Sequence, residues 1–168
     1  MVSATWEMPN GHKLTQEDGT ILRAEGFPLT EALVGAPSWD AKGLNVVFAE
    51  KAKSGGKDST QLVLAEQRAS GWSRKVIVQA DSAPNLPTIA PDGAAVAYVA
   101  TGPLGGSPGI WLVTVASGEQ VPLTNAELSF DGAAAPNQVP VPDTAPKFDG
   151  VTVSWTAKDG PHSVAAKP

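Results

Sequence analysis

The sequence predicts an all-β protein built from repeated units, and two observations carry this prediction. Residues 37–48 (PSWDAKGLNVVF) return fifty positions later as residues 87–98 (PTIAPDGAAVAY), and a version two residues shorter occupies 146–155. No segment keeps an apolar 3.6-residue period over three helical turns, whereas 17 glycines and 15 prolines suit many short strands joined by turns. A repeat of this length is typical of a unit that buries its apolar face only by stacking on copies of itself.

Each copy predicts a hairpin followed by two further strands. Gly43, Gly93 and Gly150 stand where a tight turn favours positive φ, and a short apolar run ending near an aromatic residue follows each of them. In the second half of the unit, residues 60–64 match 109–113, and both runs lead to Ala-Ser-Gly before another short strand. One unit is therefore about four short antiparallel strands, which is the composition of a β-propeller blade.

The best-matching copy resembles a known family. Its segments IAPDGAAVAYV (89–99), GIWLVTVASGE (109–119) and VPLT (121–124) are similar to the TolB-type β-propeller repeat, a WD40-like family, although Ala90 stands where that repeat usually has serine. The resemblance implies four-stranded antiparallel blades in an incomplete ring. It also implies a binding scaffold or an enzyme-associated domain, and a periplasmic or extracellular location.

The repeats divide the chain into parts of one expected domain, 1–168. We expect a half blade at 13–36, blades at 37–86 and 87–145, and a half blade at 146–168. Residues 13–30 are expected to supply only two outer strands. Because propellers need four to eight blades, we expect a homodimer that closes the ring, with residues 13–30 of one copy beside 146–164 of the other.

Other architectures remain open at this point. The chain is also compatible with an excised piece of a longer propeller or with an open stack of sheets. A further alternative is a fibronectin-like sandwich, which one strand at residues 151–156 resembles.

Composition excludes several functional classes. A net charge of −5 and a pI near 4.9 disfavour nucleic acid as a partner. No apolar run approaches the roughly 20 residues that span a bilayer, and the N-terminus lacks the layout of a signal peptide. The absence of cysteine excludes disulfides and thiol nucleophiles. Lys51, Lys53 and Lys57 predict a solvated loop between two strands.

The polar candidates predict no catalytic, cofactor or metal site. His12 and His162 have no second ligand at a metal-binding spacing. Ser107 lies in a glycine-rich segment that lacks the lysine of a phosphate-binding loop, so residues 101–108 predict a long hairpin connection. Three carboxylates precede glycine and are expected to close turns: Asp92, Asp149 and Asp159.

The tryptophans divide into two groups. Trp39, Trp111 and Trp155 occupy equivalent or nearly equivalent strand positions and are expected to pack between blades. Trp6 and Trp72 fall outside the shared pattern, so they are the candidates for stacking on a sugar or contacting a partner. Residues 126–145, rich in alanine and proline, predict a long connection that is functional or a contact surface.

Two functions compete on these grounds. The favoured one is a non-enzymatic protein-binding or assembly module, because edge strands and loops at the faces of blades recruit partners. The alternative is a carbohydrate-active or peptidase-associated propeller domain. At least five of six residues at matching strand positions should be buried: Val46, Phe48, Val96, Tyr98, Val153 and Trp155.

Overall fold

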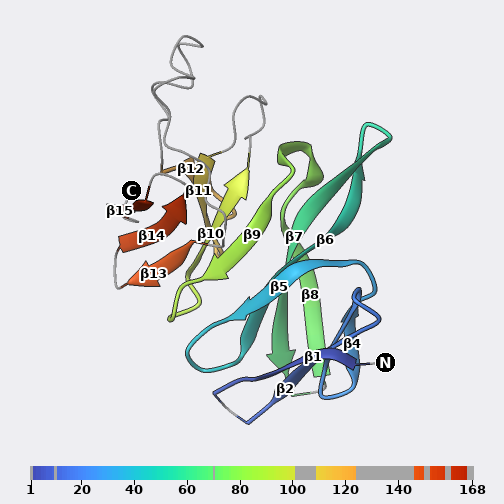
Figure 1. Cartoon of the computed structure of the whole chain (residues 1–168). Helices are drawn as coiled ribbons and strands as arrows, with labels where there is room; N and C mark the ends of the chain where they lie inside the picture. The colour runs from blue at the N-terminus through green and yellow to red at the C-terminus, as the bar shows by residue number, and fades with distance from the viewer. Residues whose placement is uncertain are drawn as a thin grey trace.

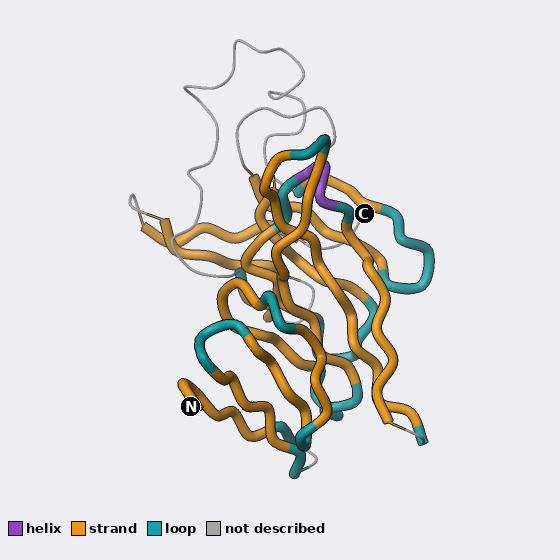
Figure 2. The backbone as a smooth tube through the Cα atoms, turned by 90° about the vertical axis from the view of Figure 1, so that its right-hand side faces the viewer, coloured by secondary structure: helices purple, strands orange, loops and turns teal. Residues whose placement is uncertain are grey.

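The chain forms four antiparallel sheets that follow one another in sequence. The computed structural model describes residues 2–9, 11–69, 71–100, 109–123, 146–149, 152–157 and 160–165. Three of the sheets have four strands, the last has three, and the ring is not closed (Figure 1). Figure 2 shows how strands dominate the backbone, with one short 3-10 helix, η1 (Ala80–Ser82). The predicted all-β class with four-stranded antiparallel sheets is therefore confirmed.

The strands of each sheet pair in sequence order. The first sheet comprises β1 (Val2–Glu7), β2 (Lys13–Glu17), β3 (Ile21–Ala24) and β4 (Phe27–Thr30). The second comprises β5 (Leu33–Trp39), β6 (Asn45–Ser54), β7 (Lys57–Arg68) and β8 (Gly71–Val78). The third comprises β9 (Asn85–Ile89), β10 (Ala95–Ala100), β11 (Gly109–Thr114) and β12 (Gln120–Pro122). The last comprises β13 (Lys147–Asp149), β14 (Thr152–Ala157) and β15 (Gly160–Ala165). The predicted connections at residues 101–108 and 126–145 lie outside the described residues.

The first sheet differs from the expectation of a half blade at 13–36. It contains four strands, because β1 precedes β2 and pairs with it, and the prediction overlooked β1. Met8 and Gly11 lie between these two strands. The Gly11 N–H donates to the Met8 carbonyl (3.0 Å), just as Gly93 donates to Ala90 (2.9 Å) in the third sheet. The last sheet likewise carries three strands rather than half a blade. Each terminal part of the chain is thus more complete than the sequence suggested.

The repeat alignment holds at the level of strand register. Trp39 lies opposite Val46, Ile89 opposite Val96, and Phe148 opposite Val153 in their respective sheets. Backbone bonds next to the turns repeat as well, since Gln67 N–H donates to the Leu44 carbonyl and Val115 N–H to that of Ala94, both at 2.9 Å. The same hydrogen bonds therefore recur in successive sheets.

The core lies between the sheets, as stacking of amphipathic units requires. One cluster packs the first sheet against the second, a second cluster packs the second against the third, and a third joins the third to the last. Five of the six predicted core residues are buried, which confirms that prediction: Val46, Phe48, Val96, Tyr98 and Val153. The side chain of the sixth, Trp155, lies outside the described set.

The lysine-rich segment is a strand hairpin rather than the predicted loop. Strands β6 and β7 have ten and twelve residues, whereas the corresponding strands β10 and β11 have six each. They pair continuously from Asn45↔Glu66 to Ser54↔Lys57 and turn at Gly55 and Gly56, both with positive φ. All three lysines are exposed, so the solvated position predicted for them is confirmed.

Candidate functional site

Trp6 occupies a position that repeats in the other sheets. It lies on β1 opposite Leu14, the place that Trp39 takes opposite Val46. The half-buried Trp6 side chain packs against the core between the first and second sheets. Trp6 therefore belongs to the repeat pattern, contrary to the expectation that it falls outside it. The expectation was wrong because β1 had not been anticipated.

Trp72 lies where the first and second sheets meet at their turns. It is the second residue of β8 and pairs with Gln67 across the β7–β8 turn. Its half-buried side chain packs on the same core, and its ring stands edge-on to that of His12, with centroids 6.5 Å apart and planes at 85°. Such an edge-to-face arrangement is a favourable aromatic geometry. Trp72 thereby contacts both sheets.

His12 links three turns around this tryptophan. Its Nδ1 lies 3.4 Å from Glu25 Oε1, and its Nε2 lies 3.0 Å from the side-chain nitrogen of Gln67. Glu25, at φ 49°, also accepts a 2.7 Å bond from Lys13 N–H. The first sheet is therefore tied to the end of β7 through polar contacts.

Two exposed apolar side chains flank this group. Phe27 is 45% exposed, and its ring lies beside Gly71, where an added Cβ would be 3.9 Å from Phe27 Cε2. Leu44 is 43% exposed, and its carbonyl accepts the N–H of Gln67. We call this surface the turn face, because its residues lie in or next to the turns at one end of the first two sheets: His12, Glu25, Phe27, Leu44, Gln67 and Trp72.

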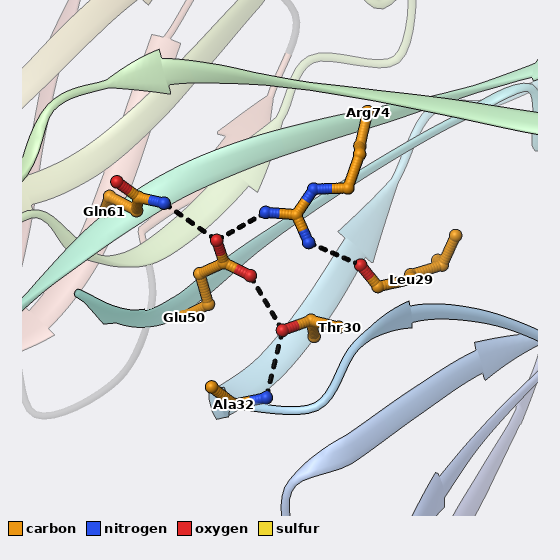
Figure 3. Close-up of polar contacts among 6 residues, drawn as sticks. All are labelled: Leu29, Thr30, Ala32, Glu50, Gln61 and Arg74. Carbon is orange, nitrogen blue, oxygen red and sulfur yellow. Dashed lines mark hydrogen bonds and ion pairs between the residues drawn. The ribbon is translucent and has the colours of Figure 1, made fainter.

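A second polar group lies buried where the chain passes from the first sheet to the second (Figure 3). Glu50, only 6% exposed, accepts bonds from Thr30 Oγ1 (2.7 Å), Gln61 Nε2 (2.8 Å) and Arg74 Nη2 (2.5 Å). Arg74 also donates to the Leu29 carbonyl at 2.8 Å. The carboxylate therefore ties β6, β7 and β8 to the end of β4.

Electrostatics support a structural role for this glutamate. Burial by itself would raise the pKa of the Glu50 carboxyl, since a charge is costly away from water. The hydrogen bonds from Arg74, Thr30 and Gln61, together with the positive charge of Arg74, outweigh burial and hold that pKa below its ordinary value. Glu50 is thus an ionised acceptor whose bonds all go to neighbouring strands.

Sequence reasoning did not single out Glu50. Its only signal is a carboxylate that directly follows the apolar run 46–49 on a strand that packs on both faces. Lone buried charges are rare unless paired, so such an interruption indicates a partner on a neighbouring strand. Nothing in the sequence indicates that the partner is Arg74.

The remaining candidates have limited roles within the described residues. Asp92 closes its turn by accepting the Ala94 N–H at 2.9 Å, as predicted. Ser107 and Asp159, and the side chains of Asp149 and His162, lie outside the described set. In the part of the chain that the structure describes, no three His, Cys, Asp or Glu side chains gather where they could hold a metal ion. The same described residues contain no helix that is long and apolar enough to cross a membrane.

Comparison with known proteins finds similar solved structures and no sequence relative. No family model matches the sequence, and no curated protein matches it. Similar solved structures include TolB from Acinetobacter baumannii (14% identity, TM-score 0.41) and a TolB from Agrobacterium tumefaciens described as putative (14%, 0.42). A chain of a nidogen/laminin complex is also similar (12%, 0.40). These alignments cover 98%, 92% and 91% of this chain, and 54%, 69% and 68% of the other chains. The chain thus spans about half the length of the first and about two thirds of the others.

Proposed function

We propose that this chain is a non-enzymatic protein-binding or assembly module and that the turn face is its contact surface. One observation carries the proposal: the exposed Phe27 ring lies beside Gly71, the residue before the half-buried Trp72, and the exposed Leu44 is bonded through its carbonyl to Gln67, which pairs with Trp72. Contiguous exposed apolar side chains with a polar rim are typical of protein contact sites. Tryptophan is among the residues that contribute most to the binding energy of protein interfaces.

The scaffold beneath the surface supports the same proposal. The turn face rests on strands whose side chains are packed in the core, while the Glu25–His12–Gln67 contacts fix the turns relative to one another. A contact surface held in place before binding loses little conformational entropy on association. Trp6 supports the turn face by packing in that core. Contact of Trp6 with a ligand remains a prediction.

Self-association and location form a finer part of the proposal. The expected homodimer rested on half blades that complete each other, and the four strands of the first sheet remove that reason for residues 13–30. We propose instead a dimer in which the turn faces of two copies meet, because an exposed apolar surface can bind a second copy of the chain as well as another protein. A periplasmic or extracellular location stays a prediction that rests on the repeat resemblance.

The experiment is a peptide-display selection on the immobilised protein, followed by affinity measurements on the selected peptides. The double variant Phe27→Ser/Leu44→Ser should lose at least about tenfold in affinity. Val2→Ser is the matched control, since Val2 is 54% exposed and outside the turn face; it should bind normally. Equal binding by all three proteins would contradict the proposal. Light scattering on the same variants tests the dimer.

A second candidate, a carbohydrate-active or peptidase-associated propeller domain, is favoured by one feature. Trp72 and the carboxylate of Glu25 each contact the same residue, His12, and a site that binds a sugar often combines an aromatic ring with a carboxylate. Saturable binding of a glycan that Trp72→Ala abolishes, or turnover of a glycan or peptide, would favour this candidate over the first.

A further inference from the structure

The hairpin of β6 and β7 carries a basic hollow at the opposite end of the second sheet from the turn face. A hollow of about 650 Å³ opens there, lined by residues of β5, β6 and β7: Val34, Lys51, Ala52, Lys53, Asp58, Ser59 and Thr60. Pockets of this volume accommodate small ligands or short peptide segments. The two surfaces share no residue, because β6 and β7 run the length of the sheet between them (Figure 1).

Strand register arranges the charges in this hollow. Lys51 lies opposite Thr60, and Lys53 lies opposite Asp58. Residues directly opposite each other in an antiparallel pair share a face, as do residues two apart on one strand. Lys51 and Lys53 therefore project from the same face of β6, roughly 7 Å apart along the strand.

The sign of the charge is unusual for this chain. Residues 51–60 contain three lysines and one carboxylate, while the whole chain carries a net charge of −5. Lys53 and Asp58 form an ion pair, yet their side chains remain 69% and 92% exposed. An exposed pair of this kind is worth little, so Lys53 can exchange Asp58 for a negatively charged ligand.

The other polar groups limit what that ligand can be. The Ser59 and Thr60 hydroxyls already donate to the carbonyls of Ala80 (2.7 Å) and Pro84 (2.6 Å). The lysine ammonium groups are therefore the donors that face a ligand, and they act as separate point charges rather than as a cradle around one phosphate. Their alternate spacing matches alternate side chains of an extended peptide. Val34 and Ala52 add apolar surface to the same hollow.

We propose that this basic hollow binds an acidic segment of a partner polypeptide, in an extended conformation, with carboxylates at alternate positions on Lys51 and Lys53. This is a second site, and it stands independently of the turn face. Nucleic acid is a poorer fit, because a long polyanion would extend past the hairpin and be repelled by the net negative charge of the rest of the protein.

The experiment measures fluorescence polarisation of a labelled peptide with glutamates at alternating positions followed by a valine. The full chain should bind it saturably at low salt and more weakly as salt rises. Lys51→Ala/Lys53→Ala should weaken binding at least about tenfold. Lys42→Ala/Lys75→Ala is the matched control, since it removes two exposed lysines and the same charge outside the hollow; it should bind normally.

A change in the opposite direction completes the test. Asp58→Asn removes the carboxylate that competes for Lys53 and should tighten peptide binding several-fold. Because Asp58 is so exposed, the substitution should not affect the folding of the protein. The proposal is overturned if the peptide does not bind, or if both double variants lose the same amount of affinity. It is also overturned if a peptide with glutamine in place of glutamate binds with the same affinity. A single-stranded oligonucleotide of equal charge that binds as tightly, with the same dependence on Lys51 and Lys53, would also overturn it.

Discussion

Arg74 on β8 donates a 2.5 Å hydrogen bond to the buried carboxylate of Glu50 on β6, and its other terminal nitrogen donates to the Leu29 carbonyl of β4. One guanidinium thus holds strands of two sheets together. Because Thr30, the last residue of β4, donates to the same carboxylate, the group acts as a joint between the first and second sheets. Its loss should therefore weaken the packing of the two sheets against each other.

Glu50→Gln should destabilise the protein by about 1–3 kcal/mol, since hydrogen bonds to a charged group contribute more than neutral ones. The glutamine keeps the shape but loses the ion pair with Arg74, whose 43% exposed side chain can regain water. Urea unfolding measures the difference. Glu66→Gln is the control, because Glu66 forms a 3.7 Å pair with the exposed Arg68 and should lose under about 1 kcal/mol. Equal losses would contradict the role of Glu50.

The same glutamate should make stability depend on acid pH. Its pKa is lower in the folded protein than in the unfolded chain, so the unfolded chain binds the proton first as pH falls. The contribution of Glu50 is complete above the ordinary glutamate pKa of 4.5 and is lost as pH falls through the lower, folded value. Unfolding free energy measured from pH 6 downward should fall less steeply for Glu50→Gln. Parallel curves for the two proteins would contradict this.

The single tyrosine gives a spectroscopic test at the other end of the pH scale. Tyr98 is fully buried and donates to Gln120 Oε1 at 2.9 Å, and burial raises the pKa of its hydroxyl well above the ordinary value of 10. The folded protein should therefore show no phenolate absorbance near pH 10, whereas the urea-unfolded chain titrates there. Because the unfolded state releases this proton first, stability should fall as pH rises above 10. A phenolate signal at pH 10 with the fold intact would show that Tyr98 is accessible.

Phe48 tests the core that the repeat alignment predicted. It is fully buried between the first and second sheets, so Phe48→Ala should cost about 3–5 kcal/mol. Leu44→Ala is the control four residues earlier, since Leu44 is 43% exposed and its truncation should cost little. Thermal unfolding of both variants measures the difference. A similar small loss in both would place Phe48 outside the core.

The sequence predicted those parts of the fold that depend on residues close together in the chain. The turn glycines and the buried positions Val46, Val96 and Val153 follow from spacing alone, because hairpin register is a local property. The first sheet was predicted only as a half blade, because β1 and the Pro-Asn-Gly sequence at 9–11 stand outside the repeats recognised from their longer pattern. That tripeptide, compared with the Pro-Asp-Gly of 91–93, was the available signal.

The candidate sites were much less predictable, because their contacts join distant parts of the chain. His12 and Gln67 are 55 residues apart, and the partners of Glu50 stand 11, 20 and 24 residues away from it. Which of these distant residues meet depends on how the strands pair within a sheet and on how one sheet stacks on the next, and the pattern of a single strand does not encode either. The edge-on contact between Trp72 and His12 also depends on how the first sheet stacks on the second.

Two glycines with nearly the same backbone conformation provide the last prediction. Gly93 has φ 77° and Gly118 has φ 75°, so replacing either with alanine strains the backbone equally. A methyl at Gly118 meets nothing within 4 Å, whereas one at Gly93 would lie 3.1 Å from Asn45 Nδ2 and 3.3 Å from Asp40 Oδ2. The two substitutions therefore differ mainly in this contact between the third and second sheets.

The groups that Gly93 faces have little room to move. Asp40 is only 4% exposed, its Oδ1 accepts the N–H groups of Leu44 and Asn45, and its Oδ2 accepts the Asn45 side chain at 2.8 Å. Gly93→Ala should thus cost about 1–3 kcal/mol more than Gly118→Ala, the usual range for overpacking a tight contact. Urea unfolding of both variants measures the difference, and Gly93→Ala should cost less in an Asp40→Ala background than in the native one, because the smaller side chain leaves room for the methyl group. Equal losses for the two glycine variants would mean that the third sheet does not press on Asp40 and Asn45.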